Sequence, residues 1–191
     1  RTYLAHPGLV RGQRGVALPN HLTPMPAAAG ERALQAGADE LTLRFESAEI
    51  DGVRLLTDPV WGLRASPFAL IGPKRFQPAP VRLRDVPQVD AVLISHDHYD
   101  HLDYPTIRTL ARRSAVPFVT SLGVGAHLED WGVAPDRITE LDWWESHRLL
   151  GTGVVATATT SQHFSGRGYS DRNATAWSTF AIRSPCLAVF F

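Results

Sequence analysis

Short apolar segments alternate with polar turns along most of the chain after residue 40. Leucine and phenylalanine alternate with polar residues in 41–45, and a second such segment, 53–56, follows the turn-forming pair Asp51-Gly52. Alternation with a period of two is typical of a strand with one buried face, so these segments predict a hairpin that starts a sheet. Further strands are predicted at residues 90–94, 116–120, 138–141, 154–160, 175–182 and 187–191.

Two segments between these strands predict helices. In 105–113 apolar residues stand three apart, and Pro105 lies near the start, where a proline fits the first helical turn. The segment 123–131 predicts a second helix. The order strand, helix, strand, helix is typical of helices layered on a sheet, so the predicted fold class is α/β.

The first 40 residues differ from the rest. They are rich in Gly, Pro and Ala, which predicts an irregular arm at 1–40 followed by one domain at 41–191. A short helix is expected within the arm at 27–36, and His6 and His21 are expected to be exposed loop residues.

A proline-rich segment, 62–87, lacks clear periodicity and is long for a loop in a compact domain. Such a loop favours a functional role, for example as a wall over a site. Its cations Arg64, Lys74 and Arg75 are candidates for contacts with an anionic substrate, although each alone fits ordinary solvated charge.

Composition excludes several classes of function. The 191 residues fit one domain, and 19 Lys+Arg balance 19 Asp+Glu, so no overall field attracts nucleic acid. No apolar run approaches the roughly 20 residues of a membrane span, so no transmembrane segment is expected, and peripheral membrane contact stays open. One cysteine, Cys186, excludes a disulfide framework within the chain. Because the chain begins at Arg1 and ends in a strand-like segment, both termini are expected to be cut. The expected location is cytoplasmic.

The densest chemistry lies in 96–103, where three histidines and three aspartates follow an apolar run. His96 and His98 are two residues apart, so they project to the same side while the chain is still extended. Two neutral imidazoles at one point suit zinc, and a third ligand from elsewhere would leave one position open for water. Asp100 and His101 can offer an oxygen and a nitrogen to a second cation beside the first.

The competing interpretation is that these are solvated loop residues, with histidines that cap the following segment. Four candidate ligands at this spacing argue against it. Asp97, Tyr99 and Asp103 alternate with the candidate ligands, so each is expected to orient a ligand, to cap the helix or to be exposed.

Other candidates come from strand ends. His163 follows the strand at 154–160, and the glycines after it allow close approach of the backbone, so it is the candidate third ligand. Asp58 is either a plain turn residue or a group that orients a ligand histidine. Arg167 is expected to support the site or to face substrate. His127 is expected to face outward or to pack on its helix, unpaired with the metal cluster.

Five motifs in order carry a resemblance to the metallo-β-lactamase superfamily, and within it to the branch that contains N-acylphosphatidylethanolamine-hydrolysing phospholipase D. They are Thr57-Asp58-Pro59 and the segments 72–76, 95–103, 141–145 and 163–168. The resemblance implies an αββα sandwich and hydrolysis by a hydroxide bound to two Zn²⁺ ions. Carried over by motif, His96, His98 and His163 hold one zinc, while Asp100 and His101 belong to the second and act in catalysis.

The chain also departs from the family pattern. The segment 44–48 lacks the Gly-His-Ser/Thr sequence usual in this branch. The bridging aspartate and the last histidine of the family would fall beyond Phe191, so we expect the N-terminal half to two-thirds of the enzyme, with at most one tightly bound zinc and little activity.

The expected function is that of a zinc-dependent phosphodiesterase acting on a small-molecule or phospholipid substrate. A lactonase or other ester hydrolase of the same fold is one alternative, because the same hydroxide attacks carbonyl carbon. A non-catalytic metal-binding fragment is another, and the oligomeric state is left open.

Overall fold

The structure is a computed structural model that describes residues 42–44, 47–68, 70–75, 79, 81–149, 151–185 and 187–191. The predicted arm at 1–40, with its short helix, His6 and His21, lies outside the described residues. Cys186 lies outside them as well.

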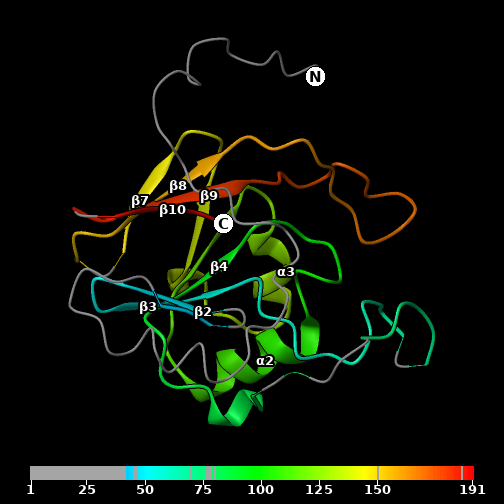
Figure 1. The fold of residues 1–191 in the computed structure, drawn as a ribbon. Coiled ribbons are helices and arrows are strands. Elements are labelled where there is room, and N and C mark those ends of the chain that lie inside the picture. The colour runs from blue at the N-terminus through cyan, green and yellow to red at the C-terminus, as the bar shows by residue number, and fades with distance from the viewer. Residues whose placement is uncertain are drawn as a thin grey trace.

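A six-stranded mixed sheet forms the centre of the fold (Figure 1). Its strands run in chain order, with β1–β3 antiparallel to one another and β3–β6 parallel. The strands are β1 (Thr42–Arg44), β2 (Ser47–Ile50), β3 (Val53–Thr57), β4 (Ala91–Ile94), β5 (Phe118–Ser121) and β6 (Ile138–Leu141).

A second, antiparallel sheet of four strands has the order β10-β9-β8-β7. Its strands are β7 (Ser146–Arg148), β8 (Val155–Thr159), β9 (Thr179–Arg183) and β10 (Ala188–Phe190). The sequence did not predict β7, because its three residues are too short for a period to show.

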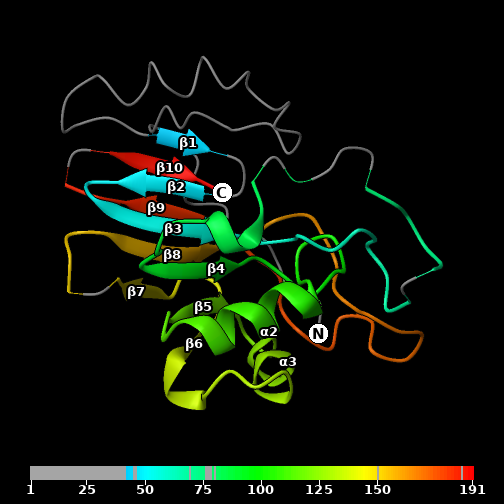
Figure 2. The ribbon, with the colours of Figure 1, turned by 90° about the horizontal axis from the view of Figure 1, so that it is seen from below.

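Helices cover one face of the first sheet, and the second sheet covers the other (Figures 1 and 2). The helices are α2 (Tyr104–Arg113) and α3 (Gly125–Asp130), with 3-10 turns η1 (Leu83–Asp85) and η2 (Pro135–Arg137). Asp103 caps α2, where its carboxylate accepts a hydrogen bond from the N–H of Thr106. The predicted α/β sandwich is confirmed, and the described residues form three of its four layers, α, β and β.

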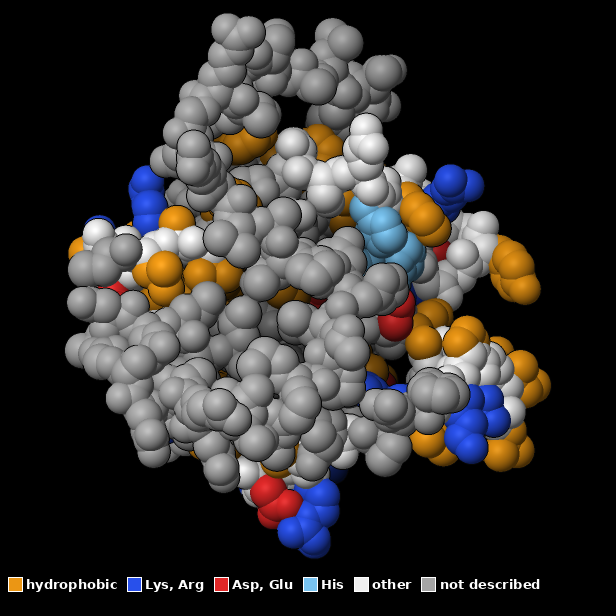
Figure 3. Space-filling view, in the orientation of Figure 1, with side chains coloured by type: hydrophobic (Ala, Val, Ile, Leu, Met, Phe, Trp, Pro, Cys, Tyr) orange, Lys and Arg blue, Asp and Glu red, His pale blue; other side chains and the backbone are white. Residues whose placement is uncertain are grey.

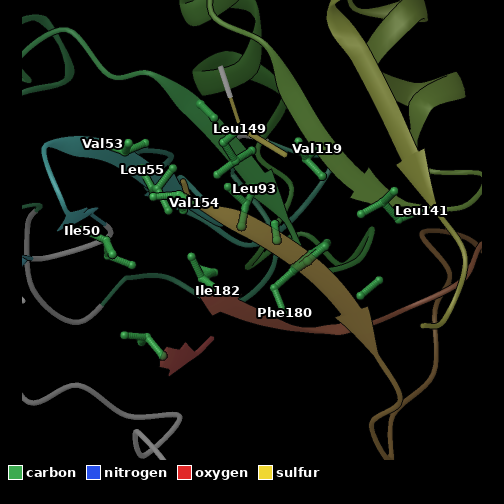
Figure 4. Close-up of a cluster of buried hydrophobic side chains, with 14 residues drawn as sticks. Ile50, Val53, Leu55, Leu93, Val119, Leu141, Leu149, Val154, Phe180 and Ile182 are labelled. Atoms are coloured by element: carbon green, nitrogen blue, oxygen red, sulfur yellow. The ribbon is translucent and has the colours of Figure 1, made fainter. Parts of the chain in front are cut away.

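Two apolar cores separate the layers. One lies between the sheets and joins Ile50, Leu55 and Leu93 of the first sheet to Phe180 and Ile182 of the second (Figure 4). The other lies between the first sheet and the helices. Phe180 is fully buried, and removing such a ring costs about 3–5 kcal/mol of stability.

The first hairpin differs from the prediction. We expected the strand at 41–45 to pair with 53–56, but β2 pairs with β3, and β1 pairs with the far side of β2. The turn explains the difference: Asp51 and Gly52 have φ values of 47° and 77°, as a two-residue hairpin turn requires, so the paired residues stand directly beside it.

Within the described part of the chain, no helix has the length and apolar character needed to cross a membrane.

Candidate metal centre

Parallel strands β3 and β4 end side by side, and this shared edge positions most of the candidate site. Asp58 follows β3, and the segment 95–101 follows β4. His163 arrives from elsewhere, because it follows β8 of the second sheet. Side chains that start from different sheets therefore meet.

His96, His98 and His163 each bring one ring nitrogen to a common point, and we call this group the imidazole triangle. His96 Nε2 lies 3.0 Å from His98 Nδ1 and 2.9 Å from His163 Nε2, and the last two atoms are 3.1 Å apart. A ring nitrogen offers either a proton or a lone pair in a single direction, so hydrogen bonds cannot satisfy all three contacts. One cation between the nitrogens can accept all three lone pairs.

The size and exposure of the triangle suit zinc. Zinc binds histidine nitrogen at about 2.0–2.1 Å in tetrahedral sites, which places ligand atoms roughly 3.3 Å apart. His96 is buried, His98 is half-buried and His163 is exposed, so one side of the triangle opens to solvent. Burial, and next the nearby His101, lowers the pKa of His96 to about 2, which keeps this ring neutral and its lone pair available.

Ser95 fixes which nitrogen of His96 carries the proton. Its hydroxyl lies 2.5 Å from Asp58 Oδ2 and 2.8 Å from His96 Nδ1. Since a carboxylate only accepts, the hydroxyl donates its one proton to Asp58 and must accept from the Nδ1–H of His96. His96 Nε2 is then unprotonated and faces the other two imidazoles. Sequence reasoning missed this role of Ser95, although a hydroxyl directly before the first histidine was a visible signal.

Asp58 also orients His101. His101 Nδ1 donates to Asp58 Oδ2 at 2.6 Å, which leaves Nε2 free on the side where Asp100 Oδ2 lies 3.8 Å away. Burial lowers the pKa of His101, but the hydrogen bond and charge of Asp58 outweigh it, and the pKa lies above its usual value. We call the two residues the Asp100–His101 pair.

The backbone of Asp58 is left-handed, with φ of 38°, and its N–H donates to Leu93 O at 2.9 Å. Aspartate enters this region more readily than most residues because its short polar side chain can bond locally. Asp58 Oδ1 accepts a hydrogen bond from the Ser95 N–H at 2.7 Å, while Oδ2 accepts hydrogen bonds from Ser95 Oγ and His101 Nδ1. Both oxygens are engaged, so we interpret Asp58 as an orienting group.

His127 was expected to have no partner in the metal stretch, and this expectation was wrong. His127 Nε2 lies 3.8 Å from Oδ2 of Asp97, which is 1% exposed and follows His96 directly. The sequence could not show this, because the contact exists only when β5, which leads into α3, lies beside β4. Burial raises the pKa of Asp97, but the facing His127 and the N–H of Gly166 outweigh it, and the pKa lies below its usual value.

Arg167 faces the metal stretch rather than solvent. Its Nη1 donates to the carbonyl oxygens of Asp97 and of Leu102, the latter at 2.9 Å, and its guanidinium lies 3.9 Å from the centre of the Tyr99 ring. Tyr99 Oη donates in return to Arg167 O at 2.9 Å. These contacts hold the loop that carries His163 against the stretch that carries His96 and His98.

The remaining candidates lie farther out. Asp103 Oδ2 accepts from the N–H of Gly62 at 3.0 Å, which ties the proline-rich loop to the start of α2. Arg75 donates to the carbonyl oxygens of Val60, just before its loop, and of Gly62. Lys74 is exposed and pairs as a β-bridge with Arg64. These contacts do not bring Lys74 or Arg75 into the imidazole triangle.

Comparison with known proteins places these residues in a wider context. The model of the family described as "Beta-lactamase superfamily domain" matches residues 53–191. An uncharacterized protein of Mycobacterium tuberculosis is 50% identical over 143 residues, which are 75% of this chain and 38% of that protein. The N-acyl-phosphatidylethanolamine-hydrolyzing phospholipase D 1 of Caenorhabditis elegans is 36% identical over 140 residues, which are 70% of this chain and 39% of that protein.

A solved structure supports the fold. A possible metal-dependent hydrolase from Veillonella parvula matches with a TM-score of 0.54 and 14% identity, over 76% of this chain and 58% of that one. The chain spans well under half the length of the two relatives above.

Proposed function

This chain belongs to the beta-lactamase superfamily, and we propose that it carries the metal centre of a zinc-dependent phosphodiesterase that acts on a phospholipid. The imidazole triangle is the observation that carries the proposal. His96, His98 and His163 would hold the first zinc, and Asp100 and His101 would contribute to a second. Bound there, zinc supplies an acidified water as nucleophile and neutralises charge on the reacting oxygens.

The protein's own residues prepare the site. The hydrogen-bonded run from Asp58 through Ser95 to His96 leaves the Nε2 lone pair of His96 free. The same carboxylate holds His101 with its Nε2 free. Partners of this kind typically contribute 10–100-fold to metal affinity or activity, because they fix the orientation and protonation of each ring.

The choice of a phosphodiester rests on the relatives. The Caenorhabditis elegans protein is named for hydrolysis of N-acyl-phosphatidylethanolamine, and a mitochondrial Saccharomyces cerevisiae protein with the same activity in its name is 31% identical over 137 residues. Cleavage of a phosphodiester bond requires a site that neutralises negative charge on the phosphate oxygens, and two adjacent cations are suited to this.

The test compares substrates and metals in the full-length protein. We expect hydrolysis of bis(p-nitrophenyl) phosphate and of N-acyl-phosphatidylethanolamine, with little turnover of a lactone panel. Elemental analysis is expected to find zinc. Histidine and carboxylate ligands also accept iron, so zinc and iron are measured together.

Three outcomes would overturn the proposal. Lactone turnover without diesterase activity would assign the site to ester hydrolysis. Activity that depends on iron instead of zinc would show that the proposed metal is wrong. Metal binding without turnover of any of these substrates would indicate a non-catalytic metal-binding role.

A further inference from the structure

The loop at residues 62–75, described at 62–68 and 70–75, exposes large apolar side chains that a folded protein normally covers. Leu63, Phe68, Leu70 and Ile71 are 58%, 63%, 86% and 69% exposed. Single exposed apolar residues are ordinary, but several within one short loop favour an interaction surface. In Figure 3 orange and blue atoms stand together on a projection beside the pale-blue histidine surface.

Hydrogen bonds hold this loop in a defined shape. The N–H of Ala65 donates to Pro73 O at 3.0 Å, and the N–H of Arg75 donates to Leu63 O at 2.8 Å. The loop therefore presents its apolar tip as a built feature, with its base anchored to the start of α2 through Gly62.

Charge indicates the kind of partner. Residues 62–75 carry three cations, Arg64, Lys74 and Arg75, and no Asp or Glu. An apolar tip with cations behind it matches the interface of an anionic bilayer, where acyl chains accept the tip and lipid phosphates attract the cations. A stable protein interface takes about 20–30 residues from each side, and residues 62–75 supply fewer than that.

Position relates the loop to the metal centre. The loop starts four residues after Asp58, and it projects from the same side of the molecule as the 163–171 loop, which exposes Phe164 and Tyr169 (Figures 1 and 2). The exposed His163 belongs to that second loop. A bilayer that contacts both loops would lie on the open side of the imidazole triangle.

We propose that the 62–75 loop docks the protein on anionic phospholipid bilayers, with Leu70 and Ile71 inserted among the lipids and Lys74 at the level of the phosphates. The choice of a phospholipid surface rests on the proposed function. The loop geometry stands independently of it.

The experiment measures partition of the full-length, metal-loaded protein onto vesicles by co-sedimentation. One set of vesicles is phosphatidylcholine alone, and the other is equimolar phosphatidylcholine and phosphatidylglycerol. The Leu70→Ser/Ile71→Ser double variant is expected to lose about tenfold or more of its partition coefficient on both sets, because it removes buried apolar area. Lys74→Gln is expected to lose about fivefold on the anionic vesicles alone.

The controls remove one exposed apolar side chain and one exposed cation elsewhere on the surface. Leu122→Ser removes an exposed apolar residue, 47% exposed, from the turn after β5, and Arg112→Gln removes an exposed cation from α2. Both are expected to bind as the parent does. Each loop variant is also expected to keep the parent's zinc content and its rate on bis(p-nitrophenyl) phosphate, because a soluble diester needs no docking.

Equal partition of parent and double variant, or no partition of the parent, would overturn the docking proposal and leave the proposed function intact. Loss of a dimer in the double variant, seen by sedimentation without vesicles, would also overturn it and assign the loop to contact between two copies of the chain. Conversely, vesicle binding without diesterase activity would overturn the proposed function and leave docking in place.

Discussion

The imidazole triangle and the Asp100–His101 pair lie side by side but are assembled differently. The triangle needs both sheets, because His96 and His98 follow β4 whereas His163 follows β8. The Asp100–His101 pair comes from one continuous stretch after β4, oriented by Asp58 at the end of the neighbouring strand. The first group thus depends on how the two sheets pack, and the second depends on one strand pairing.

Two groups with similar candidate ligands can therefore differ in how strongly their geometry depends on the packing of the fold. Loosening the core between the sheets is expected to separate His163 from His96 and His98, while the distance from Asp58 to His101 is retained. The following changes test that contrast, from the largest expected effect to the smallest.

Removal of a triangle histidine has the largest expected effect. His98→Ala is expected to lose the first zinc and to lower turnover by more than about 100-fold, the upper range for residues that only orient a ligand. Zinc content and diesterase rate are measured together in the full-length protein. His147→Ala, on β7, serves as the control and is expected to keep both. Retained turnover with one zinc fewer would point to a mechanism with a single metal.

Cavities in the two cores come next. Phe180→Ala in the core between the sheets and Leu128→Ala in the core under the helices are each expected to lower the free energy of unfolding by about 2–5 kcal/mol. Chemical denaturation measures this loss. Only Phe180→Ala is expected to weaken zinc binding in the folded protein, measured by competition with a chelator. Equal weakening by both variants would refute the idea that sheet packing sets the triangle.

Substitution of the residues that orient the rings should affect zinc binding at the two groups differently. Ser95→Ala removes the acceptor of the His96 Nδ1–H but leaves the contact of Asp58 with His101, so we expect about tenfold weaker binding of the first zinc alone. Asp58→Asn disturbs both rings and is expected to weaken both sites. Calorimetric titration with zinc distinguishes weakening of the first site alone from weakening of both sites. An effect of Ser95→Ala on both sites would contradict the separation.

The smallest expected effect concerns the loop that carries His163. Asp171 accepts hydrogen bonds from the N–H groups of Arg167, at 3.0 Å, and Gly168, at 2.7 Å, and these lower its pKa. Because the folded pKa is lowered, the stabilising contribution is present above the ordinary carboxyl pKa of about 3.9 and is lost as the pH falls through the folded value.

With both proteins free of metal, Asp171→Asn should therefore have a slightly lower midpoint of thermal unfolding than the parent at neutral pH. This difference should shrink in acid. A difference that stays constant down to the acid end would show that ionisation of Asp171 contributes nothing.

Sequence reasoning located much of this arrangement, because strand ends and short spacings carry local information. Burial of β4 and the spacing of His96 and His98 predicted that these two side chains lie together, and the structure brings His163 to them. Their role as metal ligands stays a prediction. The fold class was confirmed, since alternating strands and helices constrain the layers strongly.

What the sequence could not supply were contacts that depend on the tertiary pairing of remote segments. The approach of His127 to Asp97 requires β5 beside β4. The contact of Arg167 with Leu102 joins residues 65 positions apart. A hydroxyl such as that of Ser95 gains its meaning only when the carboxylate of Asp58 is known to lie beside it.

The left-handed backbone of Asp58 has a consequence for anyone who redesigns this centre. Glycine would adopt the φ of 38° with least strain but would remove the group that holds His101, and a glutamate would keep a carboxylate but add a longer chain where local bonding favours a short one. Asparagine keeps the conformation and loses the charge. Only aspartate combines conformational ease with two accepting oxygens here, so in a library of variants we expect this position to tolerate the least diversity of any residue outside the candidate ligands.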